Sequence, residues 1–483
     1  MSRRSVLLRT ASLAAVSALA WATTAAPALA HEAGPRDADP VPVDATYVAS
    51  GNVEFVGRFP EHSGSAGGRL LDGRFYISDP RGVTIYDVAD PAAPVKLGSV
   101  PLFQLGTGAA LGQEDPDTNG QILLVDGVDP NLPSASASLQ VVDVSDPTSP
   151  AIIGSVAVTD HTWTCVQDCT YAYGRTGHVV DLTNPANPTL TNVNWRAVTE
   201  VGSGPYTHDF TEVADGLLFS AGQPSYLLDI TDPLAPILLT QVESSFSSLG
   251  FHGIEWAHDA TDGIVVLGTE IGAGPADLVG GDCQGQGVLR TFDADAVVVE
   301  LANRTPGSSR GLRAEFEELD TWRVPGTGAF VDGYSPAGSL YCSHWFNLHP
   351  QFDAGGLMTV GYYDWGTRFI EVAPDGVMEE IGWFLPVDGY TASSYWISDD
   401  IVYSVDYRRG LEILRFIDGP SGEVVFGEAR PAPASSGVPA APVDSAAPGL
   451  PATGGGAATF ALGMVGVALG LRRRQVRQLV ASR

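Results

Sequence analysis

One stretch decides the fold: Val141-Val142-Asp143-Val144-Ser145-Asp146-Pro147-Thr148-Ser149-Pro150. Its apolar residues occur at the density of a buried strand. The Asp-Pro step that follows predicts a turn, because proline fixes its own φ and disfavours the helical conformation of the residue before it. The same phrase stands at residues 85–94, 179–188 and 227–236, and weaker copies stand at 289–295, 369–376 and 411–418.

Apolar strands flank each phrase on both sides. Residues 121–125 precede the phrase above and residues 150–156 follow it, so each repeat should form an antiparallel sheet of three or four strands. Asp143 and Asp181 stand 38 residues apart, and Asp181 and Asp229 stand 48 apart, close to the ~40–50 residues of a four-stranded propeller blade. Seven such sheets bury their apolar faces best against one another in a ring. We therefore predict an all-β, seven-bladed β-propeller of antiparallel sheets.

The phrase resembles the LVIVD repeat, a β-propeller repeat of bacterial and archaeal surface proteins. The resemblance covers residues 52–427, clearly in four copies and weakly in three. It implies the fold and no particular chemistry. A β-helix is the structural rival, although its repeats are shorter and more uniform. Residues 53–59 look like an outer strand without a blade of their own, so we expect them to close the ring in the last blade; residues 424–426 compete for that position.

Composition limits the classes of partner. The chain has 483 residues, 44% of them hydrophobic, and a formal net charge of −30. This apolar content is enough for a sizeable core and excludes wholesale disorder. A strongly negative surface repels phosphate backbones, so we predict no nucleic-acid partner. Cations and cationic partners suit the surface better.

The N-terminal end resembles an export signal. Residues 1–30 begin with basic residues, continue into a short apolar run and end in small residues of the kind found at cleavage sites. This order indicates a signal peptide that is cleaved between Ala30 and His31. Residues 2–7 also resemble a twin-arginine signal, so Sec export and twin-arginine export both remain open. Residues 31–51 would then be a flexible mature N-terminus.

The C-terminal end carries a signal in three parts. An LPxTG pentapeptide precedes an apolar segment at 457–471 and the arginines at 472–474. This order resembles the sorting signal (450–483) of Gram-positive surface proteins, which implies sortase as a partner and covalent attachment to peptidoglycan. A plain membrane anchor is the alternative. Residues 428–449, rich in Pro, Ala and Ser, predict a disordered wall-spanning linker, whereas the apolar segments of the two terminal signals should be helical. The pentapeptide consists of Leu450, Pro451, Ala452, Thr453 and Gly454.

Histidines recur near the start of the predicted units, and the first strand of a propeller blade lies at the central channel. Converging imidazoles would form a site for copper, zinc or iron; some propeller enzymes, such as the selenium-binding protein family, hold metal through channel histidines. The alternative is structural pairing of each histidine with a neighbouring aspartate, as in His208-Asp209 and His258-Asp259. The candidates for the channel are His62, His161, His208, His252 and His344, with His258 and His349 as further candidates.

A calcium loop is a second candidate metal site. Asp115, Asp117 and Asn119 stand in the pattern D-x-D-x-N-G that opens such a loop, with Asp126 at position twelve. Calcium requires oxygen ligands that converge over a sharp turn. The alternative is an acidic turn of a β-hairpin, because Pro116 and the strand that follows suit a hairpin.

The four cysteines indicate disulfides, because the protein is expected to be exported. Four cysteines allow three pairings, of which we favour Cys165–Cys169 and Cys283–Cys342. A zinc site is the alternative, but the 114 residues between Cys169 and Cys283 and the lack of a Cys-x-x-Cys pair argue against it.

These patterns point to binding rather than turnover. The chain has no nucleophile elbow, phosphate-binding glycine loop or HExxH pair, so we predict no catalytic residue. We expect a secreted, sortase-anchored propeller on the surface of a Gram-positive cell, which acts as a binding, adhesion or interaction module for an extracellular protein or glycan. Two alternatives stay open: a metal-dependent enzyme with a histidine-lined channel, and a calcium-stabilised structural wall protein.

Overall fold

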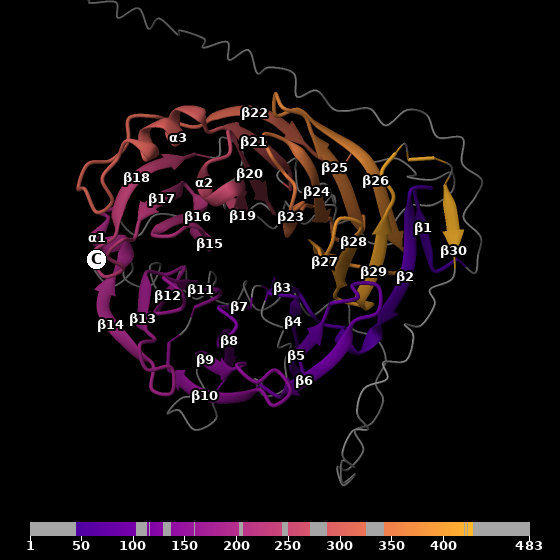
Figure 1. Ribbon diagram of the computed structural model, residues 1–483, viewed down its shortest axis with the longest axis horizontal. Coiled ribbons are helices and arrows are strands. Elements are labelled where there is room, and N and C mark those ends of the chain that lie inside the picture. The colour runs from indigo at the N-terminus through magenta and orange to yellow at the C-terminus, as the bar shows by residue number, and fades with distance from the viewer. Residues whose placement is uncertain are drawn as a thin grey trace, which may run out of the picture. The chain divides into compact units, whose positions relative to one another are not determined.

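Seven antiparallel sheets stand around a central axis and form a seven-bladed β-propeller (Figure 1). The computed structural model describes residues 45–102, 114, 116–128, 137–158, 160–201, 206–243, 250–270, 287–324, 342–419, 421–422 and 424–427. The all-β class and the seven blades predicted from the repeat are confirmed.

The strands follow one another from the axis to the rim within each blade. Blade 1 contains β3 (Gly67–Leu71), β4 (Arg74–Asp79), β5 (Gly82–Asp87) and β6 (Val95–Val100), and blade 2 contains β7 (Asp117–Thr118), β8 (Ile122–Val128), β9 (Ala137–Asp143) and β10 (Ala151–Val156). Blade 3 contains β11 (Trp163–Val166), β12 (Tyr171–Gly174), β13 (His178–Asp181) and β14 (Thr189–Asn194), and blade 4 contains β15 (Tyr206–Ala214), β16 (Leu217–Gln223), β17 (Ser225–Asp229) and β18 (Ile237–Val242).

The remaining three blades include both ends of the described chain. Blade 5 contains β19 (Phe251–Trp256), β20 (Ile264–Thr269), β21 (Leu289–Asp293) and β22 (Glu317–Trp322). Blade 6 contains β23 (Phe346–Leu348), β24 (Gly356–Gly361), β25 (Thr367–Val372), β26 (Met378–Pro386), β1 (Tyr47–Ala49) and β30 (Val425–Gly427). Blade 7 contains β27 (Thr391–Trp396), β28 (Ile401–Asp406), β29 (Gly410–Phe416) and β2 (Val53–Phe59). The described helices are short: η1 (Pro60–His62), α1 (Trp195–Val198), α2 (Ala257–Ala260) and α3 (Asp295–Ala302).

The repeated phrase forms the third strand of a blade and the turn after it. Asp143 ends β9, and its Oδ1 accepts a hydrogen bond from the backbone N–H of Ser145 at 3.0 Å. Asp146 accepts the N–H of Thr148 on Oδ1 and the N–H of Ser149 on its carbonyl oxygen, both at 3.0 Å. The hydrogen bond from the backbone N–H two residues later to Oδ1 of the strand-ending aspartate recurs at 2.8–2.9 Å after β5, β13 and β17. The two acidic positions therefore satisfy N–H groups that the strand ladder leaves unpaired.

A glycine in the outer strand lets the turn of the next blade come close. Gly154 lies at a register shift in β10, and a Cβ there would stand 2.3 Å from the carbonyl oxygen of Pro185. Gly98 in β6 has the same relation to Pro147, at 2.4 Å. No side chain fits at these separations, so the repeat requires glycine where one blade meets the turn of its neighbour.

The hydrophobic core lies between neighbouring blades. Seven clusters of buried apolar side chains, counted over the described part of the chain, each draw mainly on two adjacent blades. Between blades 5 and 6, for example, Val266 and Leu289 pack with Phe346, Met358 and Ile370. A sheet covered on both faces needs nearly continuous apolar residues, and this requirement explains the composition of the phrase.

The N-terminal strand closes the ring. β2 is the outermost strand of blade 7 and pairs antiparallel with β29, with Phe55 opposite Leu414. The prediction for residues 53–59 is therefore confirmed. The competing segment forms β30 instead and pairs with β1 at the outer edge of blade 6 (Figure 1).

The predicted targeting segments fall outside the described residues. These are the signal peptide at 1–30, the linker at 428–449 and the sorting signal at 450–483. The flexible N-terminus predicted for 31–51 is wrong at its end, because residues 47–49 form β1 between β26 and β30. Among the described residues, no helix has the length and apolar character needed to cross a membrane.

Substitution of Phe55 tests the closure of the ring. Phe55 stacks on Tyr47 and Phe384 with ring centroids 5.2 and 5.8 Å apart, so Phe55→Ala should lower the free energy of unfolding by about 3–5 kcal/mol. Denaturant titration followed by circular dichroism measures the change. Val95→Ala is the control, because Val95 is 42% exposed and its loss should cost no more than about 0.5 kcal/mol. Equal losses for the two variants would contradict the closing role of β2.

Candidate functional site: a histidine cluster at the propeller axis

Four of the predicted channel histidines meet at the axis of the propeller. His208 lies in β15 and His252 lies in β19, each near the start of the innermost strand of its blade. His161 shortly precedes β11, and His344 shortly precedes β23. Residues at the start of the innermost strands share one level of the ring, so the fold brings these four side chains together.

The four imidazole rings are in contact with one another. Nε2 of His161 lies 3.0 Å from Nε2 of His208. The rings of His208 and His252 stack with centroids 3.6 Å apart, and the centroids of His252 and His344 lie 4.4 Å apart. His208, His252 and His344 are buried, whereas His161 is partly exposed.

Two glutamates that the sequence analysis did not single out complete the site. Oε2 of Glu114 lies 3.2 Å from Nε2 of His161, 3.3 Å from Nε2 of His208 and 3.9 Å from Nε2 of His252. Oε2 of Glu270, the residue after β20, lies 3.4 Å from Nε2 of His252. The term histidine cluster below means the set His161, His208, His252, His344, Glu114 and Glu270.

Further contacts orient the edge of the cluster near His344. Its Nδ1 lies 2.7 Å from the carbonyl oxygen of Ala392. A carbonyl oxygen only accepts, so Nδ1 carries a hydrogen, and Nε2 lies on the side of Glu270, 4.0 Å from its Oε1. The hydroxyl of Tyr363 donates to Oε1 of Glu270. Contacts of this kind fix the tautomer and orientation of metal-binding groups.

Burial and charge set the protonation of the cluster. Burial lowers the pKa of His208 to about 4 despite the opposing effect of Glu114, and burial with the neighbouring imidazoles holds the pKa of His252 well below its usual value. Burial alone would raise the pKa of Glu114, but hydrogen bonds from His161 and His208 hold it well below the usual range. Burial alone would also lower the pKa of His161, but the hydrogen bond and the charge of Glu114 raise this pKa above its usual value. At neutral pH His208, His252 and Glu114 therefore have the protonation states that bind metal ions.

The geometry contains two sets of three possible ligands that share Glu114. One set combines Glu114 with His161 and His208, and the other combines it with His252 and His344; within each set the ligand atoms lie within 4.8 Å of one another. His252 is 3% exposed, and neither of its ring nitrogens has a hydrogen-bond partner among the described residues. Buried nitrogens in this state are unfavourable unless an occupant supplies the missing interaction.

Glycine at position 67 makes room for Glu114. A Cβ at Gly67 in β3 would stand 1.8 Å from the carbonyl oxygen of Glu114 and 3.0 Å from the hydroxyl of Tyr395. Any side chain at this position would therefore displace the backbone that carries the central carboxylate of the cluster.

Three other histidine candidates lie elsewhere. One is His349, whose Nε2 lies 3.3 Å from the carbonyl oxygen of Asp399 and whose Nδ1 accepts the backbone N–H of Gln351. The expectation that His62 joins the channel group is wrong, because its Nδ1 lies 2.9 Å from Asp79 and its Nε2 lies 2.7 Å from the hydroxyl of Tyr86. Both ring nitrogens of this buried histidine therefore have structural partners. Nε2 of His258 lies 3.8 Å from Asp353, and both side chains are largely exposed.

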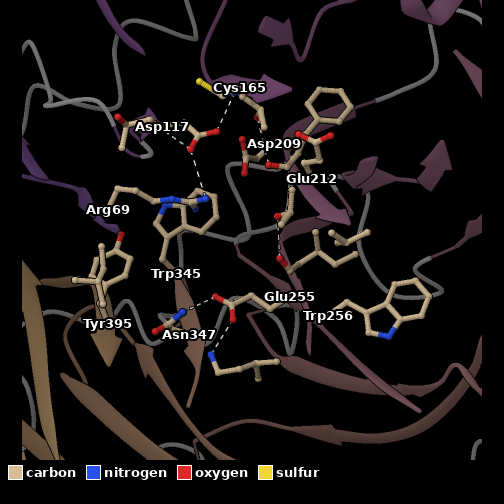
Figure 2. A pocket seen from close by; sticks show the side chains of 18 of the residues that line it. Arg69, Asp117, Cys165, Asp209, Glu212, Glu255, Trp256, Trp345, Asn347 and Tyr395 are labelled. Carbon is tan, nitrogen blue, oxygen red and sulfur yellow. Dashed lines mark hydrogen bonds and ion pairs between the residues drawn. The ribbon is translucent and has the colours of Figure 1, made fainter. Parts of the chain in front are cut away.

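Asp117 and Asn119 of the predicted calcium loop lie in the β-hairpin of β7 and β8. Asp115 lies outside the described residues. The carboxylate of Asp117 accepts the backbone N–H groups of the next residue and of Cys165, both at 2.9 Å (Figure 2). Oδ1 of Asn119 accepts two backbone N–H groups at 3.0 Å, and Asp126 accepts an indole N–H at 2.9 Å. These contacts suit the hairpin interpretation, and calcium binding stays a prediction.

The disulfide predicted between Cys165 and Cys169 is confirmed. It spans the turn between β11 and β12, in which residues 167–169 have φ values of +51° to +55°. L-residues rarely adopt this conformation, and the covalent link holds it in place. Cys342 is also disulfide-bonded, and its predicted partner Cys283 lies outside the described residues.

Substitution of Asp117 separates a structural carboxylate from a calcium ligand. Asp117→Ala leaves two backbone N–H groups without an acceptor, so the free energy of unfolding should fall by about 1–3 kcal/mol in calcium-free buffer. The exposed Glu371→Ala is the control. Thermal unfolding with and without added calcium measures the effect. A loss that appears only with calcium present would show that Asp117 acts through a bound ion.

Comparison with known proteins supports the repeat. The family model described as the LVIVD repeat matches residues 135–158, which contain the phrase at 141–150. No curated protein matches the chain. Solved structures that match include the WD40 repeats of RRP9 (9% identity, TM-score 0.45, 77% of this chain and 99% of that chain) and the Myceliophteria thermophila Cps50 (Swd1) β-propeller domain (10% identity, TM-score 0.46, 76% and 98%). The chain is thus a seven-bladed β-propeller that carries the LVIVD repeat.

Proposed function

We propose that this propeller binds a transition-metal ion in the histidine cluster. A β-propeller with LVIVD repeats is consistent with a binding or interaction module, and the cluster supplies a specific ligand class for it. The observation that carries the proposal is His252, which is buried among three other imidazoles and has no hydrogen-bond partner in the described part of the chain on either ring nitrogen.

The donor set favours particular metals. Imidazole nitrogens suit zinc, copper, iron and nickel, whereas calcium and magnesium prefer sets of oxygen ligands. Metal–imidazole bonds measure about 2.0–2.1 Å, so two nitrogens bound to one ion stand roughly 3.0–3.4 Å apart. Nε2 of His161 and Nε2 of His208 are already 3.0 Å apart. A bound ion would supply Lewis-acid or redox chemistry, and Glu114 would offset part of its charge.

Metal analysis of the purified protein tests the proposal. The protein should contain copper, zinc or iron at near-stoichiometric occupancy, and His252→Ala should weaken the affinity by more than about 100-fold, because even outer contacts of metal ligands contribute about 10–100-fold. His178→Ala is the matched control, because His178 is partly exposed and belongs to none of the groups of possible metal ligands among the described residues. Elemental analysis after dialysis and thermal shifts on re-addition of each metal provide the measurements. Protein that stays metal-free and shows no thermal shift would overturn the proposal.

We also propose that the propeller is displayed on the outside of a Gram-positive cell. The support comes from the order of the signals at the two ends: a cleavable export signal, a Pro/Ala/Ser-rich linker, the pentapeptide 450–454, an apolar segment and three arginines. Sortase would join Thr453 to peptidoglycan, and the rim of the propeller would be free to bind an extracellular protein or glycan. The negative charge of the chain favours cationic ligands at this surface.

Cell fractionation tests the attachment. In a Gram-positive host that expresses sortase, the full chain should appear in the fraction released by wall-digesting enzymes. Thr453→Ala should move it to the membrane or the medium, because the carbonyl of Thr453 is the expected point of attack. Ala452→Ser is the control, since this position of the pattern is variable. Wall attachment that survives Thr453→Ala would contradict the assignment.

A further inference from the structure

A cavity of about 710 Å³ lies next to the histidine cluster, on the other side of Trp345. The ring of Trp345 lies 5.1 Å from that of His252 and 6.1 Å from that of His208, and the same side chain lines the cavity (Figure 2). β15 and β19 carry their histidines near the start and their cavity residues further along. The cluster and the cavity are therefore two neighbouring levels of one site at the axis.

Acidic side chains dominate the charge of the cavity wall. Asp209 and Glu212 of β15 and Glu255 of β19 line it, and Asp209 is 2% exposed. Arg69 also lines the cavity, but its guanidinium lies 3.5 Å from Asp117, which offsets its charge. The wall therefore has more carboxyl groups than basic groups. Burial raises the pKa of Glu255 to about 7 and the pKa of Glu212 above its usual value, so a bound cation would favour their ionised forms.

Neutral donors hold two of these carboxylates in place. Oε1 of Glu255 accepts the side-chain N–H of Asn347 at 2.9 Å, and Oε2 accepts the backbone N–H of Leu348 at 2.8 Å (Figure 2). Glu212 accepts backbone N–H groups from Gln167 and Gly216 at 2.9 and 3.2 Å. No arginine or lysine of the described residues bonds to either glutamate, and each carboxylate oxygen keeps an unused lone pair.

Aromatic side chains form much of the remaining wall. Trp256, Trp345, Tyr395 and Trp396 line the cavity. Trp396 is 2% exposed, and its indole Nε1 has no hydrogen-bond partner among the described residues; the same is true of Nε1 of Trp345. Aromatic faces attract organic cations, and a buried indole N–H requires an acceptor.

We propose that this cavity binds a small organic ammonium ion that also carries a hydrogen-bond acceptor, such as a hydroxyl group. The carboxylates would neutralise the ammonium group, the aromatic rings would pack on its body, and the indole N–H groups would donate to its oxygen. A bare metal ion fits less well, because Asp209, Glu212 and Glu255 do not bring their ligand atoms within 4.8 Å of one another. The described residues do so in the two sets of the histidine cluster and in a third group of His258, Asp262 and Asp353.

Isothermal titration calorimetry with amines of different shape tests this inference. Choline, ethanolamine and glucosamine serve as probes, and N-acetylglucosamine is the neutral counterpart of glucosamine. At least one amine should bind saturably, and N-acetylglucosamine should bind at least about tenfold more weakly than glucosamine. Absence of binding by all three amines, or equal binding of the acetylated and free amino sugars, would overturn the proposal.

Matched variants locate the site and separate it from the metal proposal. Glu255→Gln and Glu212→Gln should each weaken amine binding by about tenfold or more, whereas the exposed Glu371→Gln should leave it unchanged. Glutamine preserves the shape of the side chain, and the thermal unfolding curve of each variant checks its fold. Amine binding should persist in His252→Ala and in protein treated with a chelator. Binding that is unaffected by both cavity substitutions would overturn the assignment, whatever the metal content.

Discussion

Neighbouring sheets cover most of one another's apolar faces in the described part of the chain, and the rest of the structure depends on this packing. Each described interblade cluster joins side chains from two neighbours, so no blade completes its core alone. The ring must therefore close. β2, near the start of the described chain, closes it by pairing with β29, which lies near its end. Glycine at positions such as 154 serves the same requirement, because it allows the turn of the next blade to approach.

Closure of the ring also concentrates polar groups at the axis. The innermost strands approach one another at their starts, where four imidazoles and Glu114 meet, and further along, where Asp209, Glu212 and Glu255 surround a cavity. Buried groups of this kind are costly unless they are paired. The paired interactions of Glu114 with His161 and His208 meet part of that cost. Neither ring nitrogen of His252 forms a hydrogen bond among the described residues, although Glu270 lies 3.4 Å from its Nε2. This is the physical reason to assign ligands to the axis rather than to the rim.

The fold was predictable from short patterns, and so were the four histidines of the six-residue histidine cluster. The turn after Asp143 uses only residues within a few positions, so the phrase carries its own structure. The four histidines were predictable because they share a position near the start of their units. Glu114 and Glu270 were not, because each is one of 56 acidic residues and neither recurs in a repeat. The expectation for His62 failed because the nearby Asp79 and Tyr86 hold both of its ring nitrogens.

The sequence by itself determined the repeat, the strand-and-turn unit and the seven-fold count, since these follow from local turn chemistry and from the spacing of apolar runs. The export and sorting signals proposed for the two ends also rest on linear patterns alone. Only the tertiary structure decided which side chains meet at the axis. Contacts between Glu114 and His252, or between Glu255 and Asn347, join residues that are about 90 or more positions apart. Their separation in space depends on the closure and curvature of the whole ring, and no local pattern specifies either.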